Sequence, residues 1–336
     1  MSKLSVGIVG LPNVGKSTLF KALTKADINV ANYPFATIDP NVGVVSVPDE
    51  RLDRLSELSK SEKKVPAIVE FYDIAGLVRG ANKGEGLGNQ FLSHIREVSI
   101  IVHVVRAFKL DDITHVEGSV DPLRDIETIN TELVLKDLEI IESRLDKVTR
   151  EAKTGDKVKQ KELAIIQKVF DVLSDGSMAS VLGEEWLEEE CIAQLGLLSS
   201  KPQILLFNGS EEDVLDDVLS KVNDLGFDHI IVDLGDEVDL ANLIRESYKT
   251  LDLITFFTTG PKETRGWTLR KGSFAPQAGG VIHSDFEDKF IRAEVVSTDK
   301  LLEAGGWSQA KAKGWVKTEG KTYVIQDGDV ILIHHS

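Results

Sequence analysis

The residues with the clearest chemical potential lie at positions 10–17, near the start of the 336-residue chain. They read GLPNVGKS, which matches the pattern G-x-x-x-x-G-K-[ST]. In this pattern the glycines let backbone N–H groups point at phosphate oxygens, the lysine reaches the terminal phosphates, and the serine hydroxyl binds Mg²⁺. Lys16 is therefore a candidate for catalysis as well as for binding. The residues expected to contact the phosphates are Asn13, Val14, Gly15, Lys16, Ser17 and Thr18.

A second motif follows at Asp73-Ile74-Ala75-Gly76. A carboxylate at this point would lie near the Mg²⁺ ion, and the glycine N–H would meet the terminal phosphate. Thr37 lies in a turn-rich stretch between the two motifs, where a switch threonine would complete the coordination of the ion. We therefore predict a metal site formed by Ser17, Thr37 and Asp73.

The motif that would recognise guanine is incomplete. A guanine-specific relative would carry Asn-Lys-x-Asp after a later strand, because the Asp carboxylate accepts hydrogen bonds from guanine N1–H and the 2-amino group. Here the apolar run 203–207 is followed by Asn208-Gly209-Ser210-Glu211, without the Lys and with Glu in place of Asp. Adenine lacks those two donors, so guanine specificity is weakened. Asn208, Gly209 and Glu211 are the expected contacts to the nucleotide on the base side.

Short apolar runs alternate with helical or loop stretches and would position these motifs. Such runs occur at 4–10, 67–72, 99–105, 203–207 and 229–234. The first leads directly into the glycine loop, and a helical pattern follows from Lys16, which is the opening of a βα unit. The alternation predicts an α/β fold with a mostly parallel sheet covered by helices.

Two regions depart from this alternation. From 125 to 199 apolar residues recur at helical spacing, with a turn signal at Thr154-Gly155, which predicts an inserted, coiled-coil-like helical hairpin. Ordinary helices covering the sheet are the alternative. After about residue 251 short Thr-, Gly- and aromatic-rich runs predict a separate β-rich domain. The predicted domains are 1–124 together with 200–252, then 125–199, and 253–336.

Composition limits the class of protein. The chain carries 39 Lys and Arg against 55 Asp and Glu, a net charge of −16, and 42% of its residues are hydrophobic. This charge argues against a protein that coats nucleic acid. Secretion and membrane spanning are not expected, because no signal peptide and no sufficiently long apolar run occur. The single cysteine, Cys191, fits a reducing compartment, so we expect a cytoplasmic protein.

Together these motifs resemble those of the YchF-type Obg-like ATPases, within the translation-factor-related class of P-loop GTPases. The resemblance spans nearly the whole chain and is carried by residues 10–18, 32–38, 73–78, 84–91, 208–211 and 278–286. It implies a P-loop NTPase G domain, a helical insertion and a C-terminal TGS domain with a β-grasp fold. It also implies Mg²⁺-dependent hydrolysis of ATP in preference to GTP, and association with the ribosome. The chain departs from the family pattern in two ways. The stretch from Glu212 to Asp252 is shorter than is usual in the family, and at 233–237 Asp-Leu-Gly-Asp-Glu replaces a Ser-Ala-like loop behind the base.

The residue that handles the attacking water is not evident from the motifs alone. Leu77 stands where Ras-like enzymes carry the Gln that orients this water. The resemblance implies a loop around His115 whose imidazole can approach the terminal phosphate and act on water; a surface histidine is the alternative. Asn13 is a second candidate, as a K⁺ ligand in the phosphate loop, against a purely loop-stabilising role. Structural roles are expected for His94, His103 and His283.

The expected partners are ATP and, by resemblance, the ribosome, with no membrane. Residues 1–124 carry 15 basic and 15 acidic groups, and residues 253–336 carry 11 and 10, so both segments are close to neutral and free to touch RNA. Two alternatives remain at this point. One is a GTPase of the same fold, and the other is a nucleotide-dependent ribosome- or RNA-binding module with negligible turnover. The sequence carries no signal for an oligomeric state.

Overall fold

A computed structural model of the protein describes residues 5–25, 41–74, 96, 98–108, 120–235 and 240–336. Residue contacts divide the chain into two units. The parallel-sheet unit comprises residues 5–22 and 71–238, and the mixed-sheet unit comprises 1–4, 23–70 and 239–336. This grouping cuts across the predicted segment 1–124, because residues 41–70 fall in the same unit as residues 240–336.

The parallel-sheet unit is built on strands that are buried along their length. β1 (Ser5–Val9), β5 (Ile100–Arg106), β6 (Gln203–Asn208) and β7 (Asp228–Val232) pair in parallel in that order. Every residue of β1, β5 and β6 is buried, as expected for parallel strands with both faces covered. Apolar residues of α8 (Asp216–Asp224) and of the first turns of α4 (Pro122–Ala152) pack on β5 and β6. The predicted parallel α/β sheet is confirmed.

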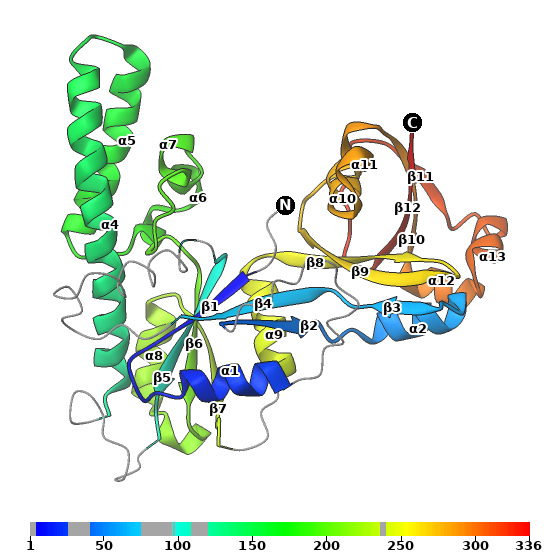
Figure 1. The fold of residues 1–336 in the computed structure, drawn as a ribbon, viewed down its shortest axis with the longest axis horizontal. Coiled ribbons are helices and arrows are strands. Elements are labelled where there is room, and N and C mark those ends of the chain that lie inside the picture. Colours follow the sequence, from blue (N-terminus) through cyan, green and yellow to red (C-terminus); the bar gives the residue numbers. More distant parts are fainter. Residues whose placement is uncertain (1–4, 26–40, 75–95, 97, 109–119, 236–239) are drawn as a thin grey trace. The chain divides into compact units, whose positions relative to one another are not determined.

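A long helical hairpin rises from this sheet, drawn in green in Figure 1. α4 (Pro122–Ala152) and α5 (Lys157–Ser174) pack against each other through a buried apolar cluster that includes Ile141, Ile166 and Val169. The carboxylates of Asp121 and Asp156 cap the two helix N-termini, and Gly155, with φ 84°, makes the turn between the helices. The pair of helices is as the sequence predicts, and its coiled-coil-like packing stays a prediction.

A buried carboxylate fixes the base of the hairpin. Asp137 on α4 is 0% exposed and accepts the backbone N–H groups of Leu198 and Ser199 at 2.9 and 2.8 Å, and the Ser199 hydroxyl at 2.6 Å. Burial raises the pKa of Asp137, while these hydrogen bonds act in the opposite direction. The segment that returns the chain to β6 is therefore held against the helix by polar as well as apolar contacts.

The mixed-sheet unit contains a six-stranded sheet with the order β11-β10-β12-β8-β9-β3. The strand bounds are β3 (Lys63–Val65), β8 (Leu253–Thr259), β9 (Glu263–Arg270), β10 (Phe290–Ser297), β11 (Lys317–Glu319) and β12 (Asp329–His335). Phe256 and Phe257, neighbours on β8, belong to different apolar clusters because successive side chains of a strand point to opposite faces. Phe256 lies with α10 (Ala275–Ile282), and Phe257 lies with α2 (Glu50–Ser59), α12 (Thr298–Ala304) and α13 (Trp307–Ala312).

Residues 47–65 join this sheet although they are distant from it in sequence. β3 pairs in parallel with β9, and Leu52 and Leu55 of α2 pack in the same cluster as Phe257. Only Pro66 and Ala67 separate β3 from β4 (Ile68–Asp73), the strand that ends at the Asp73 motif and has β2 (Val42–Ser46) as a neighbour. No local pattern in the sequence predicts this packing.

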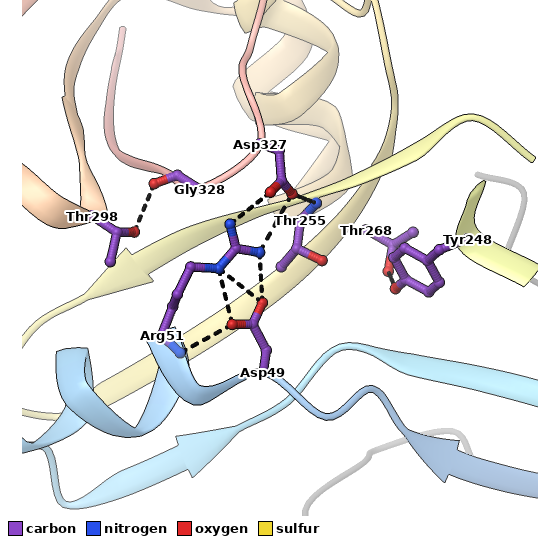
Figure 2. Close-up of polar contacts among 8 residues, drawn as sticks. All are labelled: Asp49, Arg51, Tyr248, Thr255, Thr268, Thr298, Asp327 and Gly328. Carbon is purple, nitrogen blue, oxygen red and sulfur yellow. Dashed lines mark hydrogen bonds and ion pairs between the residues drawn. The ribbon is translucent and has the colours of Figure 1, made fainter. Parts of the chain in front are cut away.

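Arg51 ties the start of α2 to the turn before β12, as Figure 2 shows. Its guanidinium donates to the Asp49 carboxylate from Nε at 2.9 Å and from Nη2 at 2.7 Å, and to Asp327 from Nη1 at 2.6 Å. Asp327 also accepts the backbone N–H of Thr255 at 2.9 Å. Its hydrogen bonds to Asp49 and Asp327 raise the pKa of Arg51, so its charge is fixed at every pH the protein meets. One arginine thus joins three separate segments of the sheet unit.

We predict that Asp327→Ala destabilises the protein by about 1–2 kcal/mol, since it removes one side of the ion pair and leaves the Thr255 N–H without its acceptor. Urea denaturation followed by circular dichroism measures the free energy of unfolding. Asp288→Ala, at an exposed position, is the matched control and should change it by less than about 0.5 kcal/mol. Equal effects of the two substitutions would contradict the role of Asp327.

Within the described ranges, no helix combines the length and the apolar composition needed to cross a membrane.

Candidate functional site

The glycine loop lies where the sequence places it, between the end of β1 and the start of α1 (Lys16–Lys25). Gly10 and Gly15 adopt φ values of 150° and 109°, which side-chain-bearing residues rarely adopt. A Cβ on Gly10 would collide with the Val104 carbonyl oxygen of β5, so the loop starts in direct contact with the neighbouring strand. Asn13 has φ 63° and an exposed side chain at the loop tip. The backbone geometry is that of a loop that can wrap a phosphate chain.

Lys16 folds back over this loop. Its side chain is 9% exposed, and its Nζ donates a hydrogen bond of 2.7 Å to the Leu11 carbonyl oxygen. Burial lowers the pKa of the Lys16 amine, and the Asp73 carboxylate partly offsets this effect. A cation held at the mouth of a glycine loop is the feature expected of a phosphate-binding lysine.

Asp73 and Ser17 supply the oxygen donors of the site. Asp73 ends β4, and the next residue, Ile74, donates its N–H to the Ile8 carbonyl oxygen of β1 at 3.3 Å. Burial raises the pKa of the Asp73 carboxyl, while the Lys16 charge lowers it. The side chains of Ser17 and Thr18 are exposed at the start of α1. Lys16 and Asp73 therefore lie within electrostatic reach of each other.

Asn208 links the base side of the site to the phosphate loop. Its Nδ2 donates to the Val14 carbonyl oxygen at 2.8 Å, and its Oδ1 accepts the Leu234 N–H at 3.1 Å. Gly209 donates its N–H to the Val232 carbonyl oxygen at 3.1 Å. Glu211 is exposed and begins a short 3₁₀ turn, η4 (Glu211–Asp213). Residues 208–209 are thus fastened both to the phosphate loop and to the end of β7.

Two predicted site residues, Thr37 and His115, lie outside the described residues, as do Gly76 and Leu77. Within the described ranges, no group of three or more His, Cys, Asp and Glu side chains gathers as a metal site would.

His103 is a feature of the site whose electrostatics the sequence did not reveal. It lies on β5 beside Val9 of β1, is 1% exposed, and its Nδ1 has no hydrogen-bond partner among the described residues. Burial, with a smaller contribution from the positive charge of Lys16, lowers the pKa of His103 from 6.5 to about 3. The residue is therefore neutral in the folded protein. The only sequence signal was its position inside an otherwise apolar strand.

His103 should make the protein sensitive to acid. Because its pKa is lower in the folded than in the unfolded chain, the unfolded chain binds more protons between pH 6.5 and about 3, and stability falls as pH decreases through that window. We predict that His103→Leu reduces the loss of unfolding free energy between pH 7 and pH 5 by about 2 kcal/mol. Urea titrations of both proteins at the two pH values measure the free energy of unfolding. Equal losses of this free energy in the two proteins would contradict the prediction.

Comparison with known proteins agrees with this geometry. The family model for a 50S ribosome-binding GTPase matches residues 5–144, and the YchF-GTPase_C model, described as a protein of unknown function, matches residues 253–336. The "Ribosome-binding ATPase YchF" of Bacillus subtilis is 48% identical, with 98% of each chain covered. The chain belongs to the YchF family.

Other YchF relatives support the same assignment. The "Obg-like ATPase 1" of Oryza sativa is 44% identical, with 98% of this chain and 91% of that protein covered. The solved structure of the Schizosaccharomyces pombe YchF GTPase has a TM-score of 0.85 and 40% identity, and covers 99% of this chain and 98% of that one. The whole fold is therefore that of a YchF protein, and the resemblance stated from the motifs is confirmed.

Proposed function

We propose that this YchF protein is a Mg²⁺-dependent ATPase that binds and hydrolyses ATP as a nucleotide switch associated with the ribosome. The observation that carries the proposal is the buried Lys16 at the glycine loop, whose charge interacts with that of the Asp73 carboxylate. A triphosphate bound there places its negative charge against an amine that is already removed from water. This interaction is stronger than the same contact at an exposed site, because the surrounding dielectric is lower.

Mg²⁺ fits the oxygen donors of the site. The ion prefers oxygen ligands and commonly takes one or two protein groups together with phosphate oxygens and water. Ser17 and Asp73 are such groups in the described part of the chain, and Thr37 is the third ligand that the sequence predicts. When bound, the ion would neutralise charge on the phosphate oxygens.

The proposed preference for ATP over GTP rests on residues 208–211. Asn208 keeps the structural role of bridging Val14 and Leu234, while the Lys and Asp of a guanine-reading motif are absent. The Bacillus and rice relatives are named as ATPases, whereas the fission-yeast protein is described as a GTPase. A GTPase of the same fold is therefore the rival to test.

The ribosome is the proposed partner because the bacterial relatives carry ribosome binding in their names. We assign residues 253–336 to a TGS domain with a β-grasp fold, which accounts for α10 packed on one face of a mixed sheet. Both this segment and residues 1–124 are close to electrical neutrality, so neither repels RNA strongly. The cytoplasm is the compartment in which such a partner would be met.

Lys16→Ala tests the catalytic site. We expect kcat/KM for ATP to fall about 100-fold or more, because the only buried cation of the phosphate loop is lost. Lys21→Ala, at an exposed position on α1, is the matched control and should retain full activity. Dissociation constants for ATP and GTP, measured side by side on the unsubstituted protein, decide between an ATPase and a GTPase.

Ribosome co-sedimentation distinguishes an enzyme from a module that only binds its partner. Nucleotide-dependent co-sedimentation that survives Lys16→Ala, in a protein whose turnover is negligible, would favour a binding module over an enzyme.

His115 is the proposed residue for orienting or deprotonating the attacking water. We predict that His115→Ala lowers kcat about 100-fold or more, within the range of general acid–base effects, and leaves the ATP dissociation constant nearly unchanged. Steady-state kinetics and equilibrium binding separate the two quantities. His335→Ala, exposed on β12, serves as the control. An unchanged turnover would remove His115 from the mechanism.

A further inference from the structure

The loop after β7 is connected to the phosphate loop through a short chain of hydrogen bonds. Leu234 donates its N–H to Asn208 Oδ1 at 3.1 Å, and Asn208 Nδ2 donates to the Val14 carbonyl oxygen at 2.8 Å. The Gly209 N–H bonds the Val232 carbonyl oxygen at 3.1 Å, on the other side of Asn208. The ends of β6 and β7 and the phosphate loop are therefore fixed relative to one another by polar contacts.

The side chain of Leu234 adds an apolar contact to this chain of hydrogen bonds. It is 5% exposed, and a Cβ built on Gly15 would lie 3.0 Å from Leu234 Cδ1. The residues on either side, Asp233 and Gly235, are exposed and joined by a hydrogen bond of 2.8 Å from the Gly235 N–H to Asp233 Oδ1. The loop thus turns one side chain inward, and that side chain rests on the glycine that precedes Lys16.

We propose that Leu234 is a positioning residue for the phosphate loop, an inference that rests on the proposed function of the site. Gly15 holds φ 109°, and both Leu234 and the Asn208 amide lie close to it on the side where a Cβ would stand. Its next neighbour is Lys16, whose ammonium and N–H group must meet the phosphates. Leu234 limits the movement of Gly15 and so keeps that peptide in the orientation that binds phosphate.

The physical argument is one of packing. Truncation of a buried leucine leaves a void that its surroundings fill only partly, so adjacent atoms gain freedom or shift. Gly15 has no side chain with which to resist such a shift. In a site that depends on preorganised N–H donors, displacement of these donors by a fraction of an ångström weakens their hydrogen bonds to the ligand. The effect should therefore appear in phosphate binding, and not only in contacts with the base.

A base-free ligand separates these two roles. Dissociation constants for ATP and for inorganic tripolyphosphate, both with Mg²⁺, are measured on the unsubstituted protein and on Leu234→Ala, Leu234→Val and Leu234→Met. We expect Leu234→Ala to weaken both ligands about tenfold, Leu234→Val to lie between, and Leu234→Met to restore binding to within about threefold, because methionine refills the volume. Leu225→Ala, 63% exposed at the end of α8, is the matched control and should change neither constant.

The inference is overturned if Leu234→Ala weakens ATP but leaves tripolyphosphate binding unchanged, since Leu234 would then contact only the base. It is also overturned if both constants are unchanged. All measurements are made where circular dichroism shows each variant folded, and the valine and methionine variants carry the test if the alanine variant does not fold. If the unsubstituted protein does not bind ATP more tightly than GTP, the proposed ATP preference is refuted. The inference about Leu234 is unaffected by that result, because the tripolyphosphate series does not depend on the base.

Discussion

A buried positive charge at the mouth of the glycine loop is the constraint on which the rest of the site depends. Removing an ammonium group from water is unfavourable unless oxygen atoms surround it. In this protein the Leu11 carbonyl oxygen accepts one hydrogen bond from Lys16, and Asp73 supplies an opposite charge. The parallel strands make this arrangement possible, because their buried cores bring the loop after β1 and the end of β4 to the same edge of a sheet. A phosphate chain adds the remaining negative charge.

The position of the glycine loop next to Lys16 is maintained by residues on the proposed base side of the site. Asn208 makes hydrogen bonds to both the phosphate loop and the loop after β7, and Leu234 covers Gly15 with an apolar side chain. The contact at Leu234 shows how the loop after β7 can support the glycine loop. The proposed base-side residues and the glycine loop are consequently parts of one packed assembly.

The mixed-sheet unit illustrates a different principle, in which a segment takes its place from contacts far away in sequence. α2 and β3 lie in the sequence between the two phosphate motifs. Leu52 and Leu55 nevertheless pack against Phe257, and Arg51 forms an ion pair with Asp327. A parallel pair such as β3 and β9 gains its hydrogen bonds only when both strands are present. The segment that leads into β4 and Asp73 therefore takes its position partly from contacts with the C-terminal strands.

The sequence by itself determined the phosphate loop, the Asp73 motif, the parallel strands, the helical hairpin and the family. Each of these depends on local spacing or on the period of apolar residues, which a linear chain displays directly. Only the tertiary structure decided the neutral state of His103, the packing of Leu234 on Gly15, the bridge made by Asn208 and the place of residues 47–65. These features depend on burial and on pairs of residues far apart in the sequence, such as Val14 with Asn208 and Arg51 with Asp327. Such pairings arise when the chain folds, because no local pattern specifies which distant groups meet.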